Sequence, residues 1–400
     1  MTTFFDPAAP VALSDPIAPA QPRRKFLRTA VGLAAGASSW PMLAGAAATT
    51  TPTTPTTMTA QTTPANQGAN AGAAAASSNA AMTQDNARRS VIIDCDPGQD
   101  DAIAILFALG ASDRLDLRAI TTVAGNVPLD LTERNARIVR DWAGLTHSLP
   151  VYAGCPRPLT RELITAANVH GKTGLDGVPL HEPLAPLAPQ HAVAFLIETL
   201  RAAPPHSVTL CALGPLTNLA TALIEAPEIR NGIRDIVLMG GAFFERGNIT
   251  PAAEFNIYVD PQAAQVVFAS GVPIVVLPRD VAVKAPITPA RIAPIRALGN
   301  RCGTMAADIM AAEVAYQKGR RGVESAPMYD PCATGYLIDP SLFKGREVNV
   351  MIETVGEWTL GETVVDWSGH SGRKPNATWI TEVDADGFYA ALGSRLATLP

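Results

Sequence analysis

One short stretch of the chain, residues 91–101, constrains the fold more than any other. Its sequence is VIIDCDPGQDD, an apolar run that changes into four carboxylates around a Pro-Gly pair. With the apolar residues 102–109 that follow, it predicts a buried strand, a tight loop and a helix. The acids then lie at the carboxyl end of the strand, where open α/β sheets bind their ligands. Crowded ionised carboxylates repel one another, and among the remedies of protonation, helix N-terminal amides and a bound cation we favour the cation.

The rest of the body of the chain alternates strand-like and helix-like runs. The predicted strands are residues 91–94, 117–123, 208–213, 233–239 and 272–277. The predicted helices include residues 131–143, 191–202, 215–225, 261–270 and 301–318. Toward the end of the chain we expect further strands over 347–355, 362–367 and 378–383 and a closing helix to Leu399. Strands of near-continuous Val, Ile and Leu between helices predict one α/β domain over residues 89–400, with a mostly parallel central sheet and helices on both faces.

Composition and cysteine spacing argue against a nucleic-acid partner and against a disulfide framework. The 400 residues are 47% hydrophobic and 17% charged, with a formal net charge of -5 at pH 7. Basic residues are scattered and aromatic residues do not interleave with them, whereas a nucleic-acid surface needs a basic stripe and stacking platforms. An odd number of cysteines cannot all pair, and no metal-binding spacing is present, so we expect mostly buried thiols. The five are Cys95, Cys155, Cys211, Cys302 and Cys332.

The first 88 residues differ from the rest of the chain and predict an export signal followed by a linker. Arg23-Arg24 precedes a weakly apolar run over residues 29–48, a pattern that resembles a twin-arginine signal peptide over 1–48, with a small-residue cleavage site at 44–46. A membrane anchor is the weaker alternative, because the run contains serine and proline, and we expect no stable anchor after processing. Residues 49–88 hold almost no large apolar side chain, which predicts a disordered linker. The expected location is periplasmic or secreted.

Polar residues follow the predicted strands at several points. Any one of these segments alone is most simply a turn or a helix cap. Because the carboxyl ends of parallel strands meet at one edge of a sheet, several such segments together predict a polar site at that edge. The segments are Ala124-Gly125-Asn126, Gly214-Pro215-Leu216-Thr217-Asn218, Gly247-Asn248, Glu254-Phe255-Asn256 and Tyr329-Asp330-Pro331.

Together with the acid-rich stretch, these motifs resemble the landmarks of the nucleoside hydrolases, the inosine-uridine preferring and related N-ribohydrolases. The resemblance covers residues 89–400, because His170-Gly171, Met239-Gly240-Gly241 and Asp330-Pro331-Cys332-Ala333 also match, in the same order. It implies a Rossmann-like nucleoside hydrolase fold and calcium-dependent (Ca2+) hydrolysis of the N-glycosidic bond of ribonucleosides, giving ribose and the free nucleobase. A homo-oligomer, dimer or tetramer, is expected by the same analogy.

The resemblance also implies roles for individual residues. The calcium ligands would be the side chains of Asp96, Asp101 and Asp330 and the carbonyl oxygen of Leu213. The chemistry agrees, because an all-oxygen ligand set favours calcium or magnesium over zinc. Asp96 would also take a proton from the attacking water, since calcium acidifies water less than zinc does. The residues expected to bind substrate are Asp100, Asn126, Asn248, Glu254, Phe255 and Asn256.

The chain departs from the family pattern on the leaving-group side. Many members carry His immediately before the last metal-binding Asp, where this chain has Tyr329. We predict that Tyr329 contacts the nucleobase, as a proton donor or by stacking, the alternative being a tyrosine that only packs. His170 is predicted to act from a mobile loop, residues 168–175, although a lone His is often structural. Residues 316–325 are a candidate second lid, unless their charges are simply solvated.

Two other classes of function remain open from the sequence. A phosphatase of the haloacid dehalogenase type would use Asp94 as its nucleophile, but Pro97 and Gly98 stand where its DxDxT motif needs threonine. We expect Asp94 instead to orient its neighbours from behind the metal ligands. An exported nucleoside- or sugar-binding protein would keep all the sugar contacts and lack turnover because of the His-to-Tyr change.

Overall fold

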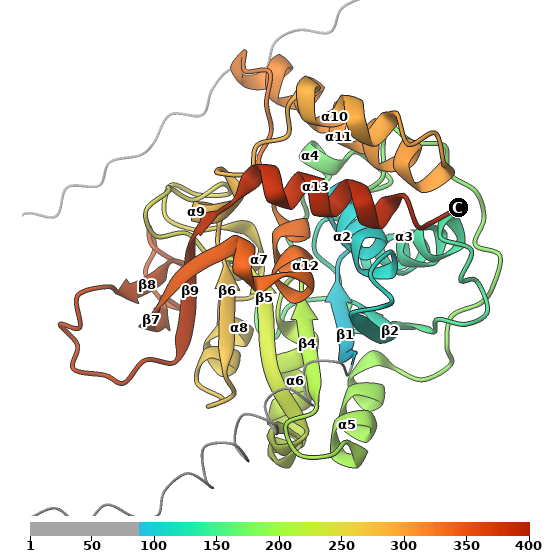
Figure 1. Cartoon of the computed structure of the whole chain (residues 1–400). Coiled ribbons are helices and arrows are strands. Elements are labelled where there is room, and N and C mark those ends of the chain that lie inside the picture. The colour runs from blue at the N-terminus through green and yellow to red at the C-terminus, as the bar shows by residue number, and fades with distance from the viewer. Residues whose placement is uncertain (1–87) are drawn as a thin grey trace, which may run out of the picture. The chain divides into compact units, whose positions relative to one another are not determined.

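The computed structural model describes residues 88–400, and a nine-stranded sheet lies at their centre (Figure 1). The strand order across the sheet is β3-β2-β1-β4-β5-β6-β9-β7-β8. The strands from β3 to β9 in this order run parallel, and β7 and β8 continue the sheet antiparallel. The strands are β1 (Arg89–Cys95), β2 (Leu115–Thr122), β3 (Val151–Ala153), β4 (Val208–Ala212), β5 (Ile233–Met239), β6 (Ile274–Leu277), β7 (Phe343–Ile352), β8 (Thr363–Asp366) and β9 (Ala377–Val383). The expected signal peptide, 1–48, and all but the last residue of the expected linker lie outside the described residues.

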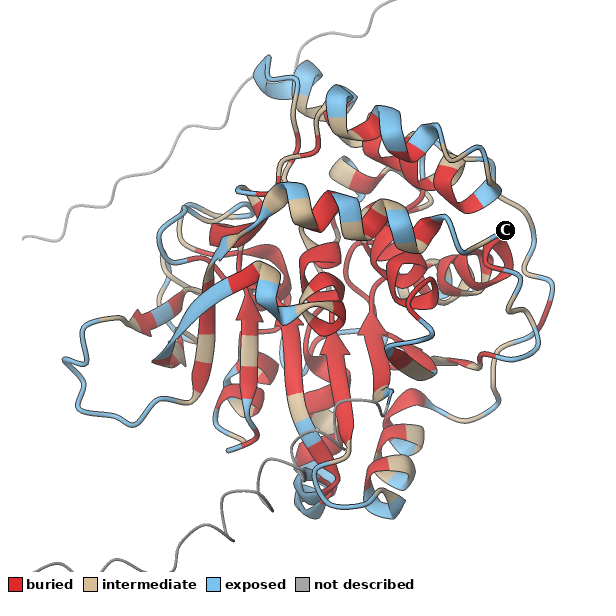
Figure 2. Ribbon diagram, viewed as in Figure 1, coloured by how far each residue is buried: buried red, intermediate tan, exposed pale blue. Residues whose placement is uncertain are grey.

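Helices cover both faces of the sheet. One face packs against α2 (Gln99–Leu109), α3 (Leu129–Trp142), α11 (Arg301–Arg321), α12 (Asp330–Ile338) and α13 (Ala385–Leu396), and the other against α5 (Ala192–Ala202), α6 (Thr217–Glu225) and α8 (Pro261–Phe268). Side chains alternate along β1, where Val91 and Ile93 pack with the first set and Ile92 with the second. Figure 2 shows buried residues along the strands and exposed residues on the outer sides of the helices. The shorter helices are α4 (Ala167–His170), η1 (Pro227–Asn231), α7 (Phe255–Val259), α9 (Arg279–Ala282), α10 (Pro289–Arg296) and η2 (Pro340–Leu342).

Most of the elements predicted from the sequence are present, with ends shifted by a few residues. The predicted strands correspond to β1, β2, β4, β5 and β6 and, in the last part of the chain, to β7, β8 and β9. The pattern does not predict β3, which has three residues, or α10, whose interior holds Pro294. The mostly parallel α/β fold with helices on both faces is confirmed.

The described part of the chain holds neither a disulfide nor a membrane-spanning helix. All five cysteines are free thiols; four are buried and Cys155 is partly exposed, as the spacing predicts. No helix within residues 88–400 has the length and apolarity needed to cross a bilayer.

Candidate active site

The loops that follow the parallel strands meet at one edge of the sheet. Cys95 at the end of β1 pairs with Thr122 at the end of β2, and the residue before it pairs with Ala212 at the end of β4. This register brings the acid-rich loop after β1 next to the loops after β2 and β4. The backbone N–H of Gly98, the N-cap of α2, donates to the Asp101 carboxylate at 2.9 Å. The start of α2 thereby fixes the acid loop at the edge of the sheet.

Three carboxylates lie close enough to share one metal ion. Oxygen atoms of Asp100, Asp101 and Asp330 lie within 4.8 Å of one another. Burial, followed by the charge on Asp100, raises the pKa of Asp101 to about 7. Burial and the neighbouring carboxylates raise the pKa of Asp330 well above its usual range. A nearby cation would favour the ionised forms of Asp101 and Asp330 by compensating their charge.

Asp96 lies beside this cluster. One of its carboxylate oxygens accepts a hydrogen bond from the backbone N–H of Asn126 at 2.7 Å, and the other, Oδ1, is buried without a partner among the described residues. Burial and repulsion by Asp101 raise the pKa of Asp96 well above its usual range. The observed cluster shares Asp101 and Asp330 with the expected ligand set and contains Asp100, whereas Asp96 lies beside it with one oxygen bonded to the Asn126 backbone.

Asp94 is held behind the site by two side chains. Its Oδ1 accepts hydrogen bonds from the hydroxyl of Thr121 at 2.6 Å and from Nδ2 of Asn218 at 2.8 Å. Burial raises the pKa of Asp94 to about 7 in spite of these two donors. Asp94 does not line the pocket that lies beside the acid cluster. This placement argues against the phosphatase alternative, in which Asp94 would attack a phosphate.

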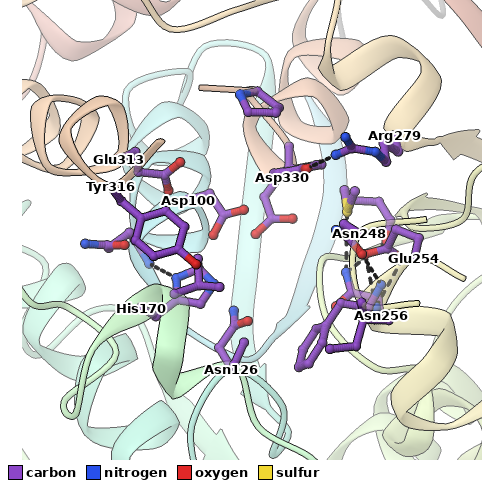
Figure 3. Close-up of a pocket in the computed structure, with 18 of the residues that line it drawn as sticks. Asp100, Asn126, His170, Asn248, Glu254, Asn256, Arg279, Glu313, Tyr316 and Asp330 are labelled. Carbon is purple, nitrogen blue, oxygen red and sulfur yellow. Dashed lines mark hydrogen bonds between the residues drawn. The ribbon is translucent and has the colours of Figure 1, made fainter. Parts of the chain in front are cut away.

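A pocket lies next to the acid cluster. Its cavity volume is about 190 Å³, larger than the ~150 Å³ cavity that admits benzene in an engineered protein core. Figure 3 shows Asp100, His170, Glu313 and Tyr316 on one side of the pocket and Asn248, Glu254, Asn256 and Arg279 on the other. Asp96 and Asp101 do not line the pocket. The other expected site residues all line it: Asp100, Asn126, His170, Leu213, Asn248, Glu254, Phe255, Asn256, Tyr329 and Asp330.

Fixed hydrogen bonds hold the wall that Glu254 and Asn256 form. Glu254 is the N-cap of α7 and accepts from the backbone N–H of Gly241 at 2.9 Å and of Asn256 at 3.1 Å. Nδ2 of Asn256 donates to the carbonyl oxygen of Leu213 at 2.7 Å. Burial raises the pKa of Glu254 to about 6. These polar groups are therefore set in place by the backbone before any ligand arrives.

His170 ends α4 and faces the pocket with a defined tautomer. The backbone N–H of Gln99 donates to its Nδ1 at 3.4 Å, so Nε2 carries the ring proton. Burial lowers the pKa of His170, which favours the neutral ring. Nε2 of Gln99 donates to the carbonyl of Asp176 at 2.7 Å, and Asp176 accepts from the hydroxyl of Thr173 at 2.6 Å. The segment expected to be a mobile loop is thus a short helix followed by a hydrogen-bonded loop.

Two pocket residues, Arg279 and Glu313, are not identified by the sequence analysis. Arg279 is the second residue after β6, and the rule that polar residues after strands form the site would have found it. Glu313 lies on α11 with Gln317 and Arg320, and their helical spacing is the only signal that they share a face toward the pocket. The expected second lid begins inside α11, which extends to Arg321.

Comparison with known proteins agrees with this geometry. The sequence model of the inosine-uridine preferring nucleoside hydrolase family matches residues 91–390. The pyrimidine-specific ribonucleoside hydrolase RihA of Salmonella arizonae is 48% identical over 310 residues, which cover 76% of this chain and 97% of that protein. Among solved structures, a plant nucleoside hydrolase, the PpNRh1 enzyme, has a TM-score of 0.72 at 30% identity, covering 78% of this chain and 99% of its own. A purine-preferring ribonucleoside hydrolase from Gardnerella vaginalis has a TM-score of 0.72 at 29% identity, covering 77% and 98%.

The family match spans most of the chain, and the structural likeness extends over the same body. The acid cluster, the pocket beside it and the polar wall of Glu254 and Asn256 all lie within the matched residues. The chain therefore belongs to the inosine-uridine preferring nucleoside hydrolase family and is an enzyme that hydrolyses the N-glycosidic bond of nucleosides.

Proposed function

We propose that this enzyme hydrolyses pyrimidine ribonucleosides to ribose and the free base, with calcium as its metal ion. The observation that carries the proposal is the acid cluster of Asp100, Asp101 and Asp330 directly beside the pocket. The preference for pyrimidines is supported by the pyrimidine-specific relative, whose 48% identity exceeds the 29% of the purine-preferring enzyme.

The residues at the cluster fit a calcium ion. Asp101 and Asp330 of the cluster, together with Asp96 beside it and the carbonyl oxygen of Leu213, would hold it, and Asp100 would face the sugar. Oδ1 of Asp96 and Oδ1 of Asp100 are buried without a hydrogen-bond partner among the described residues, and a cation would compensate both. The donor set contains only oxygen, which favours calcium or magnesium over zinc. When bound, the ion would orient the sugar hydroxyls and lower the pKa of a water molecule.

The protein's own side chains supply the base and the sugar contacts. Asp96 takes the proton of the attacking water on Oδ1, while the backbone N–H of Asn126 holds its other oxygen. Carboxylates around the sugar favour the positive charge that develops at C1′ as the bond to the base breaks. The ribose is held by Asp100, Asn126, Asn248, Glu254 and Asn256, with Phe255 packing beside them.

Two side chains serve the departing base. His170 offers its Nε2–H, because the Gln99 backbone occupies Nδ1. Tyr329 lines the same pocket and contacts the base through its hydroxyl or its ring. A hydrogen bond to the base stabilises the negative charge that the base acquires when it leaves.

A reducing-sugar assay with uridine, cytidine, inosine and adenosine, with and without chelator, tests the function. We expect ribose from uridine and cytidine, faster than from the purine nucleosides, and loss of activity in chelator that calcium restores. Faster purine hydrolysis would refute the pyrimidine preference. Nucleoside binding without ribose release would support the binding-protein alternative, and phosphate release from nucleotides alone would support a phosphatase.

We also propose that the enzyme is exported by the twin-arginine route and works as a homo-oligomer. Arg23-Arg24, followed by the weakly apolar residues 29–48, supports export. Replacing both arginines by lysine is expected to leave the protein in the cytoplasm, measured by cell fractionation. Light scattering of the processed enzyme measures its oligomeric state; a monomeric mass would refute the homo-oligomer.

A further inference from the structure

We propose that Arg279 positions Tyr329 as a hydrogen-bond donor to the leaving group. The guanidinium of Arg279 donates to the Tyr329 hydroxyl oxygen, so the hydroxyl proton is left for the ligand. The inference rests on the proposed function, because it concerns the same pocket. It adds to the proposed function the kind of leaving group that Tyr329 favours, one with a hydrogen-bond acceptor atom facing its hydroxyl.

Arg279 is held rigidly at the start of α9. Its backbone N–H donates to the carbonyl of Gly241 at 2.9 Å. The next residue, Asp280, accepts from the backbone N–H of Glu245 at 2.8 Å and from Nε1 of Trp379 at 2.8 Å. These bonds join the end of β6 to the loop after β5 and to β9. The guanidinium therefore reaches the pocket from a fixed backbone.

The guanidinium is directed at a neutral partner. Nη1 of Arg279 donates to the hydroxyl oxygen of Tyr329. No carboxylate in residues 88–400 forms a salt bridge with Arg279, and its Nε is buried with no hydrogen-bond partner among those residues. A partly buried cation is usually paired with a carboxylate. Here the cation instead supports a tyrosine in the pocket wall, next to the acid cluster.

The bond from Arg279 fixes which way the Tyr329 hydroxyl can donate. A guanidinium carries only N–H donors and cannot accept a hydrogen bond. The Tyr329 hydroxyl oxygen therefore receives a hydrogen bond from Arg279 and cannot return one, so its own proton is left for another acceptor.

The pocket is where that acceptor is presented. A pyrimidine offers its O2 carbonyl and a purine its ring nitrogens, and both gain negative charge as the glycosidic bond breaks. The nearby positive charge of Arg279 polarises the Tyr329 O–H and strengthens the bond that it donates. The role requires only donation of a hydrogen bond, and the proton stays on Tyr329. A histidine at this position could point a ring nitrogen without a proton at the ligand, whereas Arg279 leaves Tyr329 with a proton that it can donate only to another group.

A double-mutant cycle tests whether Arg279 acts through Tyr329. The variants are Arg279→Met, Arg279→Lys, Tyr329→Phe and the Met/Phe double variant, assayed with calcium on p-nitrophenyl riboside and on the best of uridine, cytidine and inosine. Arg279→Met and Tyr329→Phe are each expected to lower kcat on the nucleoside by about 10- to 100-fold, the loss typical of a hydrogen bond to a charged group. Both should leave hydrolysis of p-nitrophenyl riboside nearly unchanged, because its leaving group needs no such bond. The double variant should match Tyr329→Phe, and Arg279→Lys should recover part of the loss.

Two results would overturn the proposal. If Arg279→Met lowers the nucleoside rate as much in the Tyr329→Phe background as alone, Arg279 does not act through Tyr329. If Arg279→Met slows both substrates equally, its role is structural. The matched control is Arg246→Met, an exposed arginine in a nearby loop, which should behave as the wild type. A wild-type enzyme that hydrolyses neither substrate refutes the proposed function itself, so the two failures are distinguishable.

Discussion

The carboxylate of Asp96 fills the space against the backbone of Gly125, where a Cβ atom would overlap its oxygen and carbon atoms. Gly214 flanks the same carboxylate in the same way. Neither glycine has a positive φ, so close approach rather than backbone conformation requires glycine at both positions. The orientation of the proposed base is therefore built from the loops after β2 and β4.

Replacement of Gly125 by alanine is expected to displace the Asp96 carboxylate. Overpacking at such a site costs about 1–3 kcal/mol of stability, and the displaced base should lower kcat/KM by at least about tenfold. Urea unfolding and steady-state kinetics measure the two effects. Gly319→Ala is the matched control, because Gly319 lies on the exposed side of α11 and a Cβ atom added there would meet nothing within 4 Å, and it should gain about 0.5–1 kcal/mol. A fully active Gly125→Ala enzyme would show that the Asp96 carboxylate can move aside for the added methyl group without loss of function.

Asp330 connects metal binding with stability. Burial and the neighbouring acids raise its pKa, and a carboxyl group with a raised folded-state pKa costs stability above its unfolded pKa. At pH 7 in chelator, Asp330→Asn is therefore expected to unfold at a higher temperature than the wild type. Calcium at about 100 times its Kd should stabilise the wild type by about 2.7 kcal/mol and the variant hardly at all.

The control for this experiment is Asp308→Asn, a carboxylate on α11 that pairs at the surface with Arg296 at 2.7 Å. It should retain the full calcium shift. An equal calcium shift in Asp330→Asn and the wild type would mean that Asp330 is not a ligand.

The fold could be predicted because buried parallel strands carry continuous apolar runs. Every residue of β4 is buried, and β5 is buried from Ile236 to its end, so neither strand needs an alternating pattern to be found. The short strand β3 could not be predicted, since three residues carry no period. Helix α10 begins with Pro289 and contains Pro294, which removes the ordinary helical signal.

The site could be predicted where a polar residue sits in a Gly- or Asn-containing motif after a strand. Asn126, Glu254 and Asn256 belong to such motifs and all line the pocket. Arg279 is a single charged residue outside any motif, and Glu313 depends on how a 21-residue helix is rotated against the sheet. The sequence also does not reveal which of the neighbouring carboxylates point toward one another. The prediction therefore named Asp96 as a ligand, whereas the structure groups Asp100 with Asp101 and Asp330.

Asp176 makes the stability of the loop after α4 depend on pH. Its carboxylate accepts from the hydroxyl and backbone N–H of Thr173 and the N–H of Lys172, and these bonds lower its pKa below the usual 3.8. These bonds therefore stabilise the loop fully at pH values above the unfolded-state pKa of Asp176. The stabilisation is lost as the pH falls through the lower folded-state pKa. Asp176→Asn should accelerate amide exchange in residues 171–177 at pH 7, and the difference should disappear at acid pH. A difference that is independent of pH would exclude the carboxylate as its cause.

Asn218 joins three parts of the sheet edge behind the site. Its Nδ2 donates to Asp94 at 2.8 Å and to the carbonyl of Thr122 at 3.0 Å, and its Oδ1 accepts from the backbone N–H of Cys155 at 2.8 Å. Asn218→Leu keeps the size of the side chain but leaves Asp94 and the Cys155 N–H short of buried partners. The expected cost is about 3 kcal/mol of unfolding free energy.

Urea unfolding measures this cost, and the matched control on the same helix is Thr221→Ala. That change removes a hydroxyl bonded mainly within its own helix, to the carbonyl of Thr217 at 2.7 Å, and should cost less than about 1 kcal/mol. Asn218→Leu should also lower activity, because Asp94 precedes the acid loop by two residues and a loosened β1 end shifts Asp96. A stable, fully active Asn218→Leu enzyme would mean that the acid loop is held by its own turn and by α2 alone.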